Sequence, residues 1–348
     1  MDLSLGTLLG QMAAYPSLGV ILVLVILVTI VSGATDAPNA IASAVSTRCM
    51  KPVTALVAAA IFNFVGVMAI PYVSTAVAKT MFSMVDFSGD THVALMALMA
   101  AMIGSILWGV FCWFKGIPAS KSHSLIAGIT GGAIALNGWG GVVVGEWMMV
   151  IYGMLFSLFA GFAIGWVVVR LFEKLFKYVN RRKGNQACVV VQNALACILA
   201  FLHGAQDGSK FLSIGVLGIA LSFGMEDAGS TGFPLWLMIV CSVAMSVGTI
   251  IGGKRIIKSV AMDMVRLEKY QGVAASISTA TTLFISNIVG MPVSTSHCNT
   301  SAIMSVGASK NPRDVKWNIA GNMVLAWILT FPCCGLIGFV LAKLFMLL

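Results

Sequence analysis

The sequence predicts an all-α polytopic membrane protein with about ten transmembrane segments, arranged as two inverted five-span repeats with broken helices at the midplane. Three observations support this fold class. The composition is 59% hydrophobic and 9% charged, whereas soluble domains carry roughly 25% charged residues. Apolar runs recur along the whole chain, and a pair of polar motifs occurs once in each half. A water-soluble globule is therefore excluded.

Ten apolar runs mark the expected spans. Each has a length near the roughly 20 residues that a helix needs to cross the hydrocarbon core. Their approximate limits are 17–47, 53–71, 92–114, 118–137, 142–169, 188–224, 234–252, 271–290, 293–308 and 317–346.

Basic residues orient these spans. Five clusters, at 48–51, 115–121, 170–183, 254–269 and 310–316, hold 18 of the 21 lysines and arginines, and all five can lie on one side of the bilayer. Cytoplasmic loops are enriched in Lys and Arg, so we expect these clusters in the cytoplasm and both termini outside, in a multi-pass protein of the cell membrane. The net charge of +9 then reflects topology beside the lipid bilayer, and no nucleic-acid partner is expected.

The internal repeat defines the domain organisation. The first half contains SGATDAPNAIAS followed by GIPASKSHSLIAG, and the second contains LHGAQDGSKFLS followed by GMPVSTSHCNTSA. The aspartate-to-histidine separation is 87 residues in one half and 90 in the other. We predict a first inverted repeat at 1–170, a basic cytoplasmic linker at 171–187 and a second inverted repeat at 188–348. Five is odd, so the second repeat enters the membrane from the opposite side.

The first motif of each half predicts a break in a membrane helix. Pro38 lacks the amide hydrogen that continues a helix, and Gly204 and Gly208 flank the second aspartate. A carboxylate at membrane depth is costly unless it is paired or functional, so Asp36 and Asp207 are candidate site residues. The alternative is that each aspartate only caps the half-helix that follows it.

The second motif, Pro-x-Ser-x-Ser-His, predicts hydroxyl-bearing helix starts. Pro118 and Pro292 suit the first turn of a helix, and the amide hydrogens and dipole of a helix start favour an anion. Two such starts that face each other would form a cradle for an oxyanion, although hydroxyls at these positions also serve as plain caps. The candidate cradle residues are Ser120, Ser122, Ser294, Thr295 and Ser296.

Three histidines are candidates for a proton relay. His123 and His297 end the second motifs, and His203 lies four residues before Asp207. A histidine that locks a turn through hydrogen bonds is an equal alternative for the first two.

These motifs resemble those of the inorganic phosphate transporter (PiT) family, whose signatures are similar to Gly-Ala-Asn-Asp and Pro-Val-Ser-Thr-Thr-His. The resemblance covers nearly the whole chain. It implies uptake of phosphate coupled to sodium or protons, with the anion held between the repeats, and a homodimer as the assembly. The substrate-binding candidates are Asp36, Asn39, Ser120, Lys121, Ser122, Asp207, Lys210, Ser294, Thr295 and Ser296.

Three positions depart from the family pattern. Thr35 and Gln206 replace the signature asparagines but keep oxygen ligands, so the coupling-ion candidates are Thr35, Asp36, Asn39, Gln206 and Asp207. Lys121 stands where the family has a threonine. It either brings a fixed positive charge close to the anion or snorkels to the cytoplasm.

Electrostatics bears on the substrate independently of the resemblance. Two buried carboxylates repel an oxyanion unless cations, protons or donated hydrogen bonds intervene. Phosphate keeps a hydroxyl that can donate to a carboxylate, whereas sulfate has only acceptors, so Asp36 and Asp207 favour phosphate. Lys121 and Lys210 favour sulfate or another oxyanion, although Lys210 could instead pair with Asp207. Bound sodium ions are an alternative source of compensation, and no other cofactor is expected.

Other function classes fit less well. A channel needs a continuous polar lining, whereas the polar residues here concentrate in two motifs per half. An enzyme is not expected, because Ser122 and His123 are adjacent only in sequence and the chain has no large soluble domain. The sequence therefore favours a secondary transporter for phosphate that works by alternating access, with a sulfate permease as the alternative.

Overall fold

The computed structural model describes residues 5–115, 120–225, 232–257 and 265–347. These residues form helices and their connections, and the β pairing within them is a single antiparallel bridge between Val85 and Val142. The prediction of an all-α fold is confirmed.

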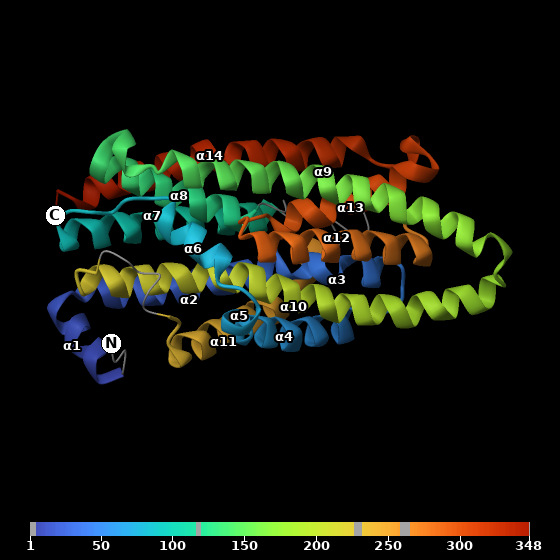
Figure 1. Ribbon diagram of the computed structural model, residues 1–348, viewed down its shortest axis with the longest axis horizontal. Helices are drawn as coiled ribbons and strands as arrows, with labels where there is room; N and C mark the ends of the chain where they lie inside the picture. Colours follow the sequence, from blue (N-terminus) through green and yellow to red (C-terminus); the bar gives the residue numbers. More distant parts are fainter. Residues whose placement is uncertain (1–4, 116–119, 226–231, 258–264, 348) are drawn as a thin grey trace.

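Most of the helices run along the long axis of the molecule (Figure 1). The first half of the chain contains α1 (Leu5–Ala14), α2 (Pro16–Thr35), α3 (Ala37–Ser46), α4 (Pro52–Met68), α5 (Ile70–Val73), α6 (Ala76–Ser83), α7 (Thr91–Lys115), α8 (Lys121–Asn137) and α9 (Val144–Leu175). The second half contains α10 (Arg181–Ser222), α11 (Leu235–Ile257), α12 (Lys269–Val289), α13 (Thr295–Lys310) and α14 (Trp317–Phe345). Short 3-10 turns are η1 (Gly138–Gly141), η2 (Phe176–Tyr178) and η5 (Pro312–Asp314).

Seven helical stretches in the described residues are long and apolar enough to cross a membrane. They are Pro16–Ser46, Thr91–Lys115, Val144–Tyr178, Arg181–Ser222, Leu235–Gly252, Lys269–Val289 and Trp317–Phe345. The other three predicted spans coincide with α4, α8 and α13, which have 17, 17 and 16 residues. The chain is thus a multi-pass helical protein, and ten full crossings remain a prediction.

Apolar side chains cover the outside of the bundle. Phe159 and Val167 on α9 are 71% and 64% exposed, and Ile328 on α14 is 62% exposed. Many large apolar side chains are exposed in this way, and an exposed apolar surface marks a membrane or partner contact. Because it lies on the long apolar helices, we assign it to lipid.

Helix packing is reciprocal between the two halves. α2 packs on α11, while α10 packs on α4; likewise α8 packs on α14, while α13 packs on α9. Glycines allow backbone contact in the first two seams, because a Cβ on Gly33 would strike the carbonyl of Met245 and one on Gly204 would strike the carbonyl of Asn63. Two related repeats would produce this exchange of partners, whereas their inverted orientation stays a prediction.

The predicted helix breaks are confirmed only in a minor form in the first half and are wrong in the second. Asp36 separates α2 from α3 but keeps near-helical angles, with φ −102° and ψ −37°. Pro38 lies in the first turn of α3, where no amide hydrogen is required.

The second motif-bearing segment is continuous, because α10 runs from Arg181 to Ser222. It contains no proline, and its two motif glycines serve close packing rather than a turn. A Cβ on Gly208 would lie 2.8 Å from a Val67 methyl group, and Gly204 contacts the α4 backbone. The glycines therefore bring α10 against α4 without interrupting it.

The predicted linker at 171–187 consists mainly of the end of α9, the η2 turn and the start of α10. This hairpin lies at one end of the bundle, and α1 and the end of α14 lie at the other (Figure 1). With 42 residues, α10 is about 63 Å long at 1.5 Å per residue, and its first turns project together with the end of α9 (Figure 1). The domain limits and the membrane orientation remain predictions.

Candidate functional site

The second motifs of the two halves meet where α8 and α13 begin, near the middle of the bundle (Figure 1). The side chain of Ser120 accepts a hydrogen bond from the His123 amide at 3.2 Å, and that of Ser294 accepts one from the His297 amide at 3.3 Å. The rings of His123 and His297 touch edge to face, with centroids 4.5 Å apart. Both serines are thus N-caps, as the plain-cap alternative requires. Pro118 lies outside the described residues.

Asp36 connects the first motif to both helix starts. One carboxylate oxygen accepts a hydrogen bond from the Ser296 hydroxyl at 2.9 Å, and the other accepts one from the Lys121 amide at 3.2 Å. The amide nitrogen of Asn39 donates to the same Ser296 hydroxyl at 2.9 Å. We call Asp36, Asn39 and Ser296 the Asp36 cluster.

Asp207 is held differently. The ammonium group of Lys210 lies 2.8 Å from one carboxylate oxygen, 2.5 Å from the Ser122 hydroxyl and 2.7 Å from the Val293 carbonyl. Ser122 belongs to the first half of the chain and Lys210 to the second, so this group also joins the two halves. We call Asp207, Lys210 and Ser122 the Asp207 cluster. Lys210 therefore pairs with Asp207, which was one of its two predicted roles.

The second oxygen of Asp207 faces a polar chain that extends to α4 and α11. The oxygen accepts a hydrogen bond from Ser32 at 3.4 Å, and the Nε2 atom of His203 lies 3.2 Å away. The other ring nitrogen of His203 hydrogen-bonds Asn63 at 2.8 Å, and Asn63 donates to Thr249 at 3.3 Å. Of the three predicted relay histidines, His203 is the one that reaches an aspartate within the described residues.

Ser32 and Asn63 were not predicted from the sequence. Ser32 is the first residue of the first motif, and Asn63 is a polar residue inside an otherwise apolar run; these were the signals available. Asn299 and Thr300 on α13 were missed as well. The amide atoms of Asn299 and the hydroxyl of Thr300 are buried and have no hydrogen-bond partner among the described residues. A buried polar group without a partner is uncommon and calls for a ligand, a water or a functional explanation.

The charged residues of the site are shielded from solvent on all sides. Asp36 is 1% exposed, and Asp207 and Lys210 are 0% exposed. Charges at such depth are stable only when paired or hydrogen-bonded. The structure thus describes a closed polar centre rather than an open pore.

Lys121 donates its backbone amide to Asp36, and its ammonium group acts on Asp36 electrostatically without forming an ion pair with it. The side chain is fully buried, so the snorkelling alternative is wrong. Its ammonium group lies against Gly109 on α7, where an added Cβ would leave no space. Because Gly109 has no side chain, the interior has space for the lysine. The position of Lys121 in the sequence could not indicate this space.

The remaining coupling-ion candidates show mixed contacts. The Thr35 hydroxyl donates to the Val31 carbonyl of its own helix at 2.9 Å, and the Gln206 amide donates to the Met291 carbonyl at 3.1 Å. Buried oxygens on Asn39, Gln206 and Thr295 have no hydrogen-bond partner in the described part of the chain. Such oxygens are suitable ligands for a hard cation.

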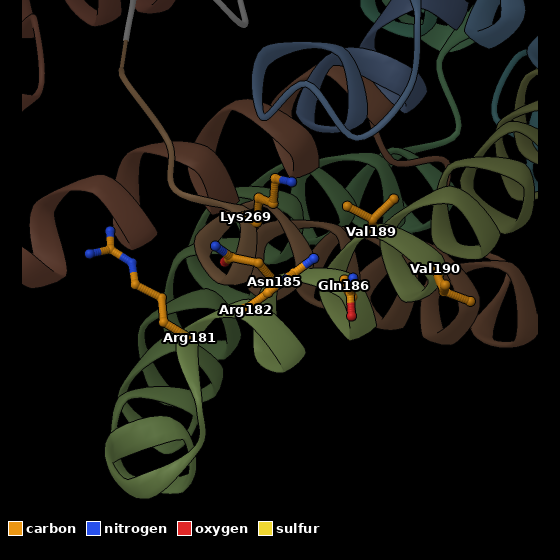
Figure 2. A pocket seen from close by; sticks show the side chains of 7 residues that line it. All are labelled: Arg181, Arg182, Asn185, Gln186, Val189, Val190 and Lys269. Carbon is orange, nitrogen blue, oxygen red and sulfur yellow. The ribbon is translucent and has the colours of Figure 1, made fainter.

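Two basic hollows lie outside this centre. One, of about 710 Å³, is lined by residues at the starts of α10 and α12 and includes Arg181, Arg182 and Lys269 (Figure 2). The other, of about 1030 Å³, lies beyond the C-terminal end of α3 and includes Arg48, Lys51 and Arg266 among its lining residues. α3 begins beside Asp36, so the second hollow and the Asp36 cluster lie at opposite ends of one helix.

The fold and the site define a multi-pass helical membrane protein with a closed polar centre at the junction of its two halves. A sequence model of the phosphate transporter family matches residues 32–338. The chain belongs to this family.

Comparisons with individual proteins agree. A "Probable low-affinity inorganic phosphate transporter" of Bacillus subtilis (strain 168) is 32% identical over 92% of this chain and 96% of its own length. One of the same description from Rhizobium meliloti (strain 1021) is 32% identical over 93% and 95%. A solved structure, "The sodium-dependent phosphate transporter", has the same fold, with a TM-score of 0.88 at 18% identity over 96% of this chain and 100% of its own. The relatives are transporters, in agreement with the prediction against an enzyme.

Proposed function

We propose that this protein carries inorganic phosphate across the cell membrane together with a cation, by alternating access. The observation that carries the proposal is the carboxylate of Asp36, which is buried and hydrogen-bonded at once to Ser296 of α13 and to the amide of Lys121 at the start of α8. The Asp36 carboxylate can bind a cation, and the two helix starts that converge on it can bind an anion beside that cation.

The anion site in this proposal consists of the α8 and α13 starts with Ser122, Ser294, Thr295 and Ser296. Helix starts supply amide hydrogens and a positive dipole end to an oxyanion. Phosphate is favoured over sulfate at the Asp36 cluster, because its hydroxyl can donate to a carboxylate. Lys210 already neutralises Asp207, so this preference depends on Asp36 alone.

The cation site in this proposal is the Asp36 cluster. The buried Asn39 oxygen without a hydrogen-bond partner in the described residues and the Asp36 carboxylate provide oxygen ligands of the kind that sodium takes in transporters. The solved protein with the same fold is described as sodium-dependent, and we propose sodium as the first cation to test. Protonation of Asp36 is the alternative, and it would make uptake depend on a proton gradient.

The path in this proposal follows α3. The hollow at the end of α3 is lined by basic residues, which attract an anion. With the basic loops in the cytoplasm, this hollow would be the cytoplasmic mouth. Movement of one half against the other would open the centre to each side in turn.

Uptake by purified protein in liposomes tests the proposal. Labelled phosphate is compared with labelled sulfate, under a sodium gradient and separately under a proton gradient. We expect phosphate uptake that one of these gradients drives and that excess sulfate does not inhibit. Sulfate uptake with phosphate excluded, or phosphate uptake that neither gradient stimulates, would contradict it.

The variant Asp36→Asn tests the named residue. We expect coupled uptake to fall on the order of 100-fold, because replacing a residue that supports an ion site typically costs 10 to 100-fold. Asp90→Asn is the matched control: Asp90 is an exposed aspartate whose side chain accepts hydrogen bonds at the start of α7, and asparagine also caps helices. Uptake near the normal rate in Asp36→Asn would contradict the role of Asp36 in coupled uptake.

A further inference from the structure

The Asp36 and Asp207 clusters occupy matched places in the repeat but differ at one position. The residue three places after the aspartate is Asn39 in one cluster and Lys210 in the other. In both clusters this residue donates a hydrogen bond to the serine that lies two places after the capping serine of a helix start. The two clusters therefore differ chiefly by one positive charge.

The ammonium group of Lys210 is fully coordinated by oxygen. Its three donors match three acceptors: the Asp207 carboxylate at 2.8 Å, the Ser122 hydroxyl at 2.5 Å and the Val293 carbonyl at 2.7 Å. A carboxylate, a hydroxyl and a main-chain carbonyl form a typical ligand set for a hard cation. The lysine thus places its charge where three such ligands converge.

The Asp36 cluster contains no charge in direct contact with its carboxylate, although the buried ammonium group of Lys121 acts on Asp36 electrostatically from outside the cluster. The partners of the Asp36 carboxylate are a hydroxyl and a main-chain amide, and no ammonium or guanidinium group forms an ion pair with it in the described residues. Asn39 is neutral, and its side-chain oxygen is buried without a hydrogen-bond partner there. The oxygen ligands of this cluster are therefore open to a cation that binds in direct contact, which the distant Lys121 charge does not provide.

We propose that Lys210 is a tethered counter-cation that takes the place of a mobile coupling cation at Asp207, so that each phosphate is carried with one cation, bound at the Asp36 cluster. This inference rests on the proposed cation-coupled transport and specifies its stoichiometry.

A tethered charge differs from a mobile cation in that it cannot exchange. A buried carboxylate needs compensation in every conformation that excludes water. A ligand influences a conformational equilibrium only through a difference in its affinity for the two states. An ammonium group fixed to α10 neither binds nor leaves, so it neutralises Asp207 throughout the cycle and adds nothing to the dependence on cation concentration.

The variant Lys210→Asn tests this inference, because it gives the Asp207 cluster the residue found in the Asp36 cluster. Uptake of labelled phosphate in proteoliposomes is measured against the concentration of the cation that drives the unmodified protein. We expect a Hill coefficient of about one for the unmodified protein and about two for Lys210→Asn. The ratio of cation to phosphate flux should rise from one to two in parallel.

Two further variants serve as controls. The double variant Asp207→Asn with Lys210→Asn removes both charges of the pair, so it should keep a flux ratio of one. Lys79→Asn removes an exposed lysine outside both clusters and should leave the ratio and the rate unchanged. Size-exclusion profiles in detergent verify that each variant is folded.

A flux ratio of two or more in the unmodified protein would overturn the inference, and so would active Lys210→Asn protein with an unchanged ratio. If Lys210→Asn does not fold, the ratios of the unmodified protein and of the double variant still decide the question. Phosphate uptake that no cation stimulates would instead refute the proposed coupling. This outcome is seen in the unmodified protein alone, so it is distinguished from a failure of the Lys210 inference.

Discussion

The two buried aspartates show how matched positions in a repeat can acquire different chemistry. Asp36 lies at a helix junction and accepts hydrogen bonds from neutral groups, whereas Asp207 lies inside a continuous helix and forms an ion pair. The comparison teaches that sequence repetition fixes where a carboxylate stands, while a neighbour three residues away fixes how its charge is balanced.

The largest effect that separates the two clusters should come from Asp207→Asn. This change leaves the Lys210 ammonium buried without its carboxylate, and breaking a buried pair in this way costs about 3–5 kcal/mol. We expect a clear drop in the unfolding temperature in detergent, while Asp36→Asn unfolds near the normal temperature.

The double variant Asp207→Asn with Lys210→Met provides the control for that prediction. Replacing both members of a buried pair by neutral groups is often nearly neutral for stability, so most of the loss should be recovered. Equal unfolding temperatures for Asp36→Asn and Asp207→Asn would show that the two carboxylates are balanced alike.

A second variant, Asn39→Lys, should make the Asp36 cluster resemble the Asp207 cluster. A lysine here can reach the Ser296 hydroxyl, which Asn39 already contacts, and the Asp36 carboxylate beside it. We expect phosphate uptake that the cation gradient no longer stimulates, with a smaller loss of folded protein than in Asp207→Asn. Uptake that keeps its full cation dependence would contradict the assignment of the cation to Asp36. Asn39→Gln is the control for side-chain length.

The smallest effect concerns the helix caps, in which the two halves agree. Ser120→Ala and Ser294→Ala each remove one hydrogen bond to a histidine amide, and loss of an N-cap costs roughly 1 kcal/mol. We expect nearly equal small decreases in unfolding temperature for the two variants. A difference of several-fold would contradict the equivalence of the two caps.

The sequence predicted the helical class and the limits of most helices, because apolar runs and charged loops are strong local signals. It also predicted that Asp36, Asn39, Ser122 and Ser296 belong to one site, because both motifs recur in both halves. Each of these residues forms a hydrogen bond with a residue of the other half of the chain.

What failed depended on contacts between distant segments. Gly204 and Gly208 on either side of Asp207 predicted a break in α10, but both pack closely against α4 and the helix continues. The direction of the Lys121 side chain depends on Gly109, a residue on another helix. Asn63 became recognisable only when the fold placed it beside His203. Local patterns do not contain this information.

The polar character of α13 has a consequence for how the protein is made. Its sequence, TSHCNTSAIMSVGASK, has 16 residues, and all but the last are buried. A segment with so few apolar side chains gains little from partitioning into lipid, and membrane helices of this kind depend on contacts with their neighbours. In the structure α13 packs on α9 and α12, both of which precede it in the chain. During synthesis, therefore, α13 should enter the bilayer only after α9 and α12 have packed together. A substitution that disturbs the packing of these two helices should appear first as failed insertion of α13 rather than as lost transport.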